Sequence, residues 1–145
     1  MKFLNLPIVV RKLFSPKKTK HLLLGEQGEK LARRLVKNLE MKILCRNFSG
    51  STGEIDIVAR DGATICFIEV KTRTISDRSR PIDSITTAKK RKVTRTAKYY
   101  LRKIGNPNVA YRFDVIEIVF QNNKMIEARY WPNEFTSSAS ESDFF

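Results

Sequence analysis

The chain has 145 residues, of which 41% are hydrophobic, and this is enough for one domain with a buried core. Its 28 lysine and arginine residues outnumber 15 acidic residues, so the formal net charge is +13 and an anionic partner, first of all nucleic acid, is expected. No stretch is long and apolar enough to span a bilayer, so we expect no membrane partner. One histidine and two cysteines exclude a finger-type zinc site, so any metal would have oxygen ligands.

The two ends differ in composition from the middle of the chain. Residues 1–24 form a basic arm, and Pro7 interrupts its short apolar run without a cleavage site, so we predict a cytoplasmic location. Residues 136–145 are rich in serine, acidic and free of basic residues, which is typical of a flexible tail. This tail could also dock on a protein partner or fold back on a basic surface. The folded domain is expected at 25–135.

The first half of the domain predicts one helix and three strands. Leu31 and Leu35, with the apolar residues around them, recur at helical spacing, and a Gly-containing turn and an Asp61-Gly62 turn separate the β-branched runs that follow. The predicted ranges are Gly25–Glu40 for the helix and Lys42–Phe48, Glu54–Arg60 and Thr64–Lys71 for the strands.

The second half predicts a helix followed by two strands. After a polar loop at Thr72–Pro81, a helix is expected at Ile85–Ile104, with strands at about Arg112–Phe120 and Lys124–Trp131. The order of elements predicts an α/β fold, with a mixed sheet of about five strands flanked by helices.

The second helix has a strongly basic face without acidic residues, which predicts a surface that contacts phosphates. Lys89 is different, because it lies four residues from both Ile85 and Val93 and should point toward the sheet. A lysine that only covers apolar surface with its stem is the alternative for Lys89. The predicted nucleic-acid contacts are Arg73, Lys89, Lys90, Arg91, Lys92, Arg95 and Lys98.

Charged residues within the apolar strands predict a catalytic site. Asp56 lies in the run Ile55–Val58, and Glu69 and Lys71 share one face of the next strand. A charge placed there is costly unless it is paired, binds a metal or does chemistry. Magnesium is commonly held by one or two carboxylates, and a neighbouring lysine can activate water or offset negative charge in phosphodiester hydrolysis. Glu29, on the first helix, could complete the set.

Structural readings of the same residues remain open. A Glu-x-Lys pair on a strand is usually an ordinary ion pair, although the apolar residues around Glu69 favour a site. Glu26 and Glu29 lie in a first helical turn, where acids stabilise the helix dipole in any case.

Several blocks of the chain resemble the YraN family of bacterial proteins. They are Gly25–Ala32, Arg46-Asn47-Phe48, Gly53–Asp56, Phe67–Arg73, Lys89 and Arg112–Val115. The resemblance runs from about Gly25 to Phe120 and implies a restriction-endonuclease-like (tRNA-endonuclease-like) core, related to archaeal Holliday junction resolvases and the PD-(D/E)xK nucleases. It implies a site with Glu29, Asp56 and Glu69 as ligands of Mg²⁺ or Mn²⁺ and Lys71 as the catalytic lysine. The sequence departs from the family pattern at Arg78-Ser79-Arg80.

Three functions therefore follow as expectations. The first is a metal-dependent endonuclease that acts on structured or branched DNA in repair, recombination or DNA processing, and related resolvases imply a homodimer. The second is a DNA-binding module with weak or no catalysis that works with a partner. The third is an RNA-directed variant. No recognition helix or base-stacking platform is evident, so affinity should come mainly from contacts to phosphate.

Overall fold

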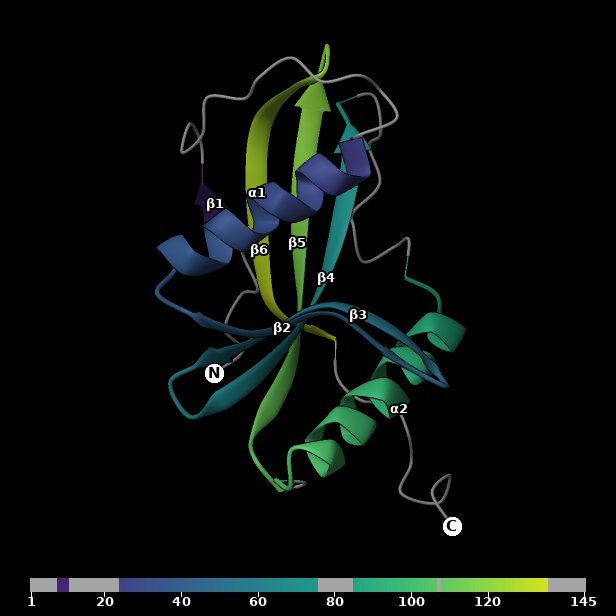
Figure 1. Cartoon of the computed structure of the whole chain (residues 1–145). Helices are drawn as coiled ribbons and strands as arrows, with labels where there is room; N and C mark the ends of the chain where they lie inside the picture. The colour runs from purple at the N-terminus through teal and green to yellow at the C-terminus, as the bar shows by residue number, and fades with distance from the viewer. Residues whose placement is uncertain (1–7, 11–23, 76–84, 107, 136–145) are drawn as a thin grey trace, which may run out of the picture.

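A computed structural model describes residues 8–10, 24–75, 85–106 and 108–135 of the protein. Figure 1 shows a twisted sheet with helix α1 crossing β6, β5 and β4 and helix α2 at the other end of the molecule. The elements are β1 (Ile8–Val10), α1 (Leu24–Asn38), β2 (Lys42–Gly50), β3 (Gly53–Asp61), β4 (Thr64–Thr74), α2 (Thr87–Lys103), β5 (Tyr111–Gln121) and β6 (Lys124–Phe135).

The strands form one mixed sheet in the order β1-β6-β5-β4-β3-β2. Only β4 and β5 are parallel among the described strand pairs, and α2 lies in the connection between them, because a parallel pair needs a crossover. The expected α/β fold with a mixed sheet and flanking helices is confirmed, and it is consistent with a restriction-endonuclease-like core. The sheet has one more strand than the five expected, because β1 in the N-terminal arm pairs with β6.

Alternate residues of the central strands enter two separate cores, one under each helix. Cys66 and Ile68 of β4 pack with α1, whereas Ile65 and Phe67 pack with α2. The helices therefore lie on opposite faces of β4 and β5. The helical residues buried in these cores are Leu31, Ala32, Leu35 and Val36 of α1, and Val93, Ala97, Tyr100 and Leu101 of α2.

The boundaries of the elements follow local chemistry. Helix α2 begins two residues later than predicted because Thr86 is its N-cap and accepts a hydrogen bond from the backbone N–H of Lys89 at 3.1 Å. The predicted turns are confirmed at Asp61-Gly62, where Gly62 has φ +58°, and after β5, where Asn122 and Asn123 have φ +50° and +60°. Both cysteines are free, and burial raises the pKa of Cys66 to about 12.

Three segments discussed from the sequence lie outside the described residues: most of the basic arm at 1–24, the loop residues 78–80 and the tail 136–145. Within the described part of the chain, neither helix has the length and apolar character needed to cross a membrane.

Candidate active site

The sheet opens where β3 leaves β4. Pairing between these strands ends at Ile57 and Ile68, although β4 continues beside β5 as far as Thr74. Beyond that point β3 pairs only with β2, back to Gly53, and Figure 1 shows the two strands curving away from the direction of β5. Asp56 and Glu69 are the first residues past the last pair, so their side chains lie at the start of this opening.

Asp56 bridges the opening to the neighbouring strand. Its Oδ2 accepts a hydrogen bond of 2.7 Å from the backbone N–H of Val70, a group that β3 no longer pairs. The pKa of Asp56 is raised to about 7, first by burial and then by the charge of Glu69. The Val70 N–H and Lys89 act in the opposite direction, while Glu29 raises the pKa as well. Asp56 therefore binds a proton near neutral pH when no cation is present.

Glu69 is buried, with 8% of its surface exposed, and two ammonium groups approach the same carboxylate oxygen. Lys71 Nζ lies 3.5 Å and Lys89 Nζ lies 3.3 Å from Glu69 Oε1. Lys71 comes from the same face of β4, and Lys89 comes from the first turn of α2. The contact with Glu69 agrees with the prediction, made from helical spacing, that Lys89 points toward the sheet.

Helix α1 brings Glu29 near the same opening. The N-terminal part of α1 packs closely on β4: a Cβ atom built at Gly28 would lie only 2.0 Å from Thr72 Oγ1. Glu29 is partly buried, and its charge reaches Asp56, since it raises the pKa of that carboxyl. The structure thus brings Asp56, Glu69 and Lys71 to one opening, and Glu29 lies near enough for its charge to act on Asp56. Within the described residues, no three His, Cys, Asp or Glu side chains are close enough to form a ready metal cage.

The predicted phosphate contacts on α2 have mixed settings. Arg91, Lys92 and Arg95 are exposed, whereas Lys89 and Lys90 are partly covered. Lys90 Nζ lies 5.8 Å from the centre of the Phe135 ring. Lys98 is also partly covered. Among the predicted contacts on α2, the side chains open to solvent are therefore those two to six positions beyond Lys89.

Arg73, one of the predicted nucleic-acid contacts, is largely covered, with 14% of its side chain exposed. Its guanidinium pairs with Glu117 of β5, whose carboxylate is fully buried. Arg129 of β6 contacts the same carboxylate at 3.2 Å and Glu127 at 2.6 Å. Sequence reasoning missed this network, although one signal was available: Glu117 interrupts an apolar run from Val115 to Val119.

A second missed network lies on the opposite face of β5. Asp114 is fully buried and accepts hydrogen bonds from Arg112 Nε at 3.1 Å, from the Asn133 N–H at 2.7 Å and from the Tyr130 hydroxyl. Arg112 also reaches Asp61, in the turn between β3 and β4, at 2.9 Å. These contacts tie β5 to β6 and to the β3–β4 turn, so they have a structural role.

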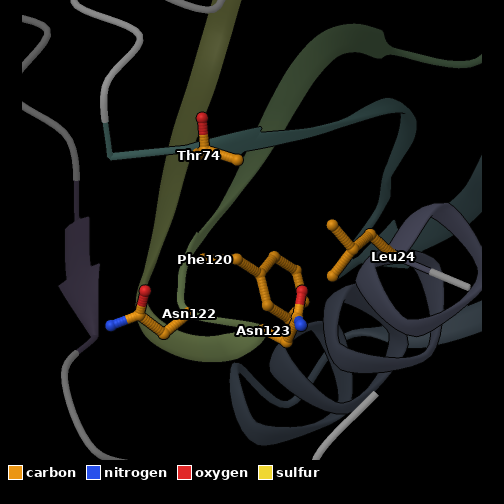
Figure 2. Close-up of a pocket in the computed structure, with 5 residues that line it drawn as sticks. All are labelled: Leu24, Thr74, Phe120, Asn122 and Asn123. Atoms are coloured by element: carbon orange, nitrogen blue, oxygen red, sulfur yellow. The ribbon is translucent and has the colours of Figure 1, made fainter. Parts of the chain in front are cut away.

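A cavity of about 300 Å³ lies on the α1 face, away from the four site residues. In the view of Figure 2, the Phe120 ring lies between Leu24 of α1 and Asn122, with Thr74 of β4 above the ring. Asn122 and Asn123 complete the lining from the β5–β6 turn. None of the predicted catalytic or metal-binding residues lines this cavity.

Comparison with known proteins places the chain in a family. Residues 28–118 match the model of "Uncharacterised protein family UPF0102". Several relatives bear the name UPF0102 protein, and three of them show the extent of the similarity. The one from Geobacter metallireducens is 44% identical over 112 residues, which is 77% of this chain and 91% of the relative. Those from Desulfosudis oleivorans and Caldicellulosiruptor saccharolyticus are 42% and 38% identical, over 70% and 77% of this chain and 82% and 96% of the relatives. The chain belongs to the UPF0102 family, which is the YraN family of the sequence resemblance.

Proposed function

We propose that the opening beside β4 is the active site of a divalent-metal-dependent nuclease that acts on branched or otherwise structured DNA. The observation that supports this most is the departure of β3 from β4, which leaves Asp56, Glu69 and Lys71 together where β4 is no longer paired with β3. The charges of Glu69 and Glu29 both oppose ionisation of Asp56, and such an arrangement is costly to keep without a function.

The donor set suits a hard cation. Glu29, Asp56 and Glu69 offer only carboxylate oxygens, which Mg²⁺ and Mn²⁺ prefer. The pKa of Asp56 is raised first by burial and then by repulsion from Glu69 and Glu29, and a divalent cation would relieve that repulsion. When bound, such an ion supplies an activated water and stabilises charge on the phosphate oxygens.

Lys71 and Lys89 have different roles in this proposal. Lys71 Nζ lies 3.5 Å from Glu69, so it can orient a water or offset the negative charge that develops on a phosphate oxygen in the same opening. Lys89 approaches from α2 and would hold the phosphate from the other side. The resemblance to restriction-endonuclease-like nucleases supports these assignments, since its metal and lysine positions correspond to the same residues.

Affinity for DNA would come from the basic face of α2. Arg91, Lys92 and Arg95 are exposed, and α2 contains no acidic residue to oppose them. Because Arg73 is held by buried Glu117, we do not assign it a phosphate contact. Such a surface binds any duplex through its backbone, so the substrate preference must arise from DNA shape.

The test compares cleavage of a labelled four-way junction, a matched linear duplex and single strands, in Mg²⁺, Mn²⁺ or EDTA. Glu69→Gln and Lys71→Gln should each lower the cleavage rate at least about 100-fold, the size typical of a removed catalytic group. Glu54→Gln and Lys124→Gln change the net charge equally at exposed positions and should cut like the wild-type protein. Cleavage that survives in EDTA, or that is equal in all five proteins, would contradict the proposal.

One observation favours a second candidate, a DNA-binding module without catalysis. Glu69 is already neutralised by Lys71 and Lys89, and Asp56 already has a hydrogen-bond donor, so the carboxylates are satisfied without a metal. This reading predicts that the wild-type protein binds the junction but cuts none of the substrates. It also predicts that Glu69→Gln leaves DNA affinity unchanged.

A further inference from the structure

A cavity of about 210 Å³ lies between the β2–β3 turn and the outer side of α2. Its lining combines hydroxyl groups, cations and one aromatic ring, and it contains no acidic residue. The lining residues are Ser51, Thr52, Arg95, Lys98, Tyr99 and Arg102. None of them belongs to the candidate active site.

The wall formed by α2 follows from helical geometry. Arg95, Tyr99 and Arg102 are spaced by four and three residues, so they form one stripe along the helix. One hydrogen bond, between Thr52 and Thr96, joins the facing turn to α2. Thr96 Oγ1 donates to the Lys92 carbonyl at 2.8 Å, so the 2.8 Å contact with Thr52 Oγ1 must use the proton of Thr52. The cavity is therefore bordered by elements that are already tied together.

Tyr99 provides a rigid ring in this cationic setting. Its side chain is 41% exposed, and its ring packs against Phe48 of β2 with centroids 5.9 Å apart. Lys103 Nζ lies 5.9 Å from the centroids of both rings. Gly50 allows the close approach, because a Cβ atom there would lie 3.2 Å from Cδ1 of Tyr99. No stacking platform was evident from the sequence, since Phe48 and Tyr99 are 51 positions apart (99 minus 48) and meet only in the fold.

An exposed aromatic ring among arginines is the arrangement that binds a nucleotide of an unpaired strand. A base can stack on the ring, and the adjoining phosphate can pair with a guanidinium, whereas the bases of an intact duplex are already stacked on each other. An acidic peptide or a free phosphate would use the cations but would gain nothing from the ring.

We propose that this cavity binds one nucleotide of an unpaired DNA strand, with its base against Tyr99 and its phosphate between Arg95 and Arg102. The proposal rests on the proposed function, because it names the part of a branched substrate that the protein holds. Arg95 and Arg102 are six and thirteen positions from Lys89 along the helix (95 minus 89 and 102 minus 89), so the cavity extends from about 10 to about 20 Å along α2 from Lys89. The unpaired arm would then be held at a distance from the scissile phosphate.

The test measures binding of labelled dT12 and of a 12-base-pair duplex by fluorescence anisotropy, in EDTA so that no cleavage occurs. Tyr99→Leu should weaken dT12 binding about 10-fold, the loss expected for one stacked base, and should change duplex binding less than about twofold. Tyr99→Phe keeps the ring and should bind both ligands like the wild-type protein. Equal dT12 affinity of the Leu and Phe variants would overturn the proposal.

A second measurement uses the wild-type protein and does not depend on how the Leu variant folds. Oligonucleotides that carry one 5-iodouracil are irradiated with the protein, and the crosslinked residue is identified by mass spectrometry. We expect the crosslink at Tyr99, and crosslinks that map only to other residues would overturn the proposal. If both binding tests contradict the role of Tyr99, the cleavage test of the nuclease proposal still stands. Conversely, a protein that binds dT12 through Tyr99 but cuts no substrate would refute the nuclease proposal and leave the nucleotide site in place.

Discussion

Asp56 and Glu69 face the same opening between β3 and β4, but their neighbours differ. Glu69 has two lysine ammonium groups within 3.5 Å, whereas Asp56 has one backbone N–H and the repulsion of two other acids. Burial first, and then the charge of Glu69, raises the pKa of Asp56 to about 7, so this carboxyl binds a proton near neutral pH.

The first prediction concerns the pH dependence of stability. The folded-state pKa of Asp56, about 7, lies above its ordinary value of 3.8, so proton binding stabilises the fold fully below pH 4 and this contribution is lost as the pH rises through 7. Asp56→Asn cannot ionise and keeps an acceptor for the Val70 N–H. In EDTA, the Tm of the variant relative to wild type should rise between pH 5 and pH 8, by on the order of 5 °C. A Tm difference that does not change with pH would contradict the assignment.

The second prediction concerns the buried carboxylate of Glu117. Glu117→Gln preserves the size of the side chain but leaves the guanidinium groups of Arg73 and Arg129 without their shared anion. Because breaking a buried ion pair exposes uncompensated charge to a low dielectric, unfolding in urea should show a loss of about 3 kcal/mol. Glu54→Gln, at an exposed position, should change stability by less than about 0.5 kcal/mol. Similar losses in both variants would show that the ion pairs of Glu117 add no more to the free energy of unfolding than an exposed carboxylate does.

At the scale of elements, the placement of α1 against β4 depends on Gly28. Alanine is the better helix former by about 1 kcal/mol, but a Cβ atom at Gly28 would overlap Thr72 Oγ1 at 2.0 Å. We therefore predict that Gly28→Ala destabilises the protein by about 1 to 3 kcal/mol, because the helix must move away from the sheet. Thermal unfolding measures this effect.

Two further variants control this measurement. Gly25→Ala meets nothing within 4 Å and should leave stability unchanged or raise it slightly. Thr72→Ala removes the overlapping oxygen, so it should recover most of the loss when it is combined with Gly28→Ala. If the double variant shows the summed losses of both single variants, the two residues do not constrain each other.

Most elements were predictable because their signals are local. The leucine spacing in α1, the alternation in β3 and β4 and the asparagines after β5 each require only neighbours along the chain. The additional strand β1 was not predictable, since a three-residue run gains its meaning only from pairing with β6. The opening at Asp56 could not be predicted from the sequence either, because the twist and packing of the sheet set the number of residues over which β3 pairs with β4.

The same limit applies to the site residues. Asp56, Glu69 and Lys71 stood out because charges in apolar runs are costly, and the structure brings them together. Arg73 was expected to contact nucleic acid, but it pairs with Glu117, which lies 44 positions away (117 minus 73) on another strand. The setting of a residue such as Arg73 therefore depends on partners that are distant in the chain, and local sequence patterns do not reveal them.

At the scale of the whole molecule, the charge of +13 predicts a binding surface that is sensitive to salt. Arg91→Gln with Lys92→Gln removes two exposed cations from α2. The slope of log affinity against log salt for a 20-base-pair duplex should become shallower by about 1 for each phosphate that the variant no longer neutralises. Lys124→Gln, at an exposed site on β6, should leave the slope unchanged. Equal slopes in all proteins would show that Arg91 and Lys92 of α2 do not contact the DNA.

The measurement that tests the central assignment most directly is titration with Mn²⁺, followed by the electron paramagnetic resonance signal of the free ion. It does not depend on choosing the right DNA substrate. We predict one bound ion per chain at pH 8, weaker binding at pH 6 because Asp56 is then protonated, and loss of binding in Asp56→Asn and Glu69→Gln but not in Glu54→Gln. Absence of binding at millimolar Mn²⁺, or equal binding by the wild-type protein and both site variants, would contradict the assignment of this opening as a metal-dependent active site.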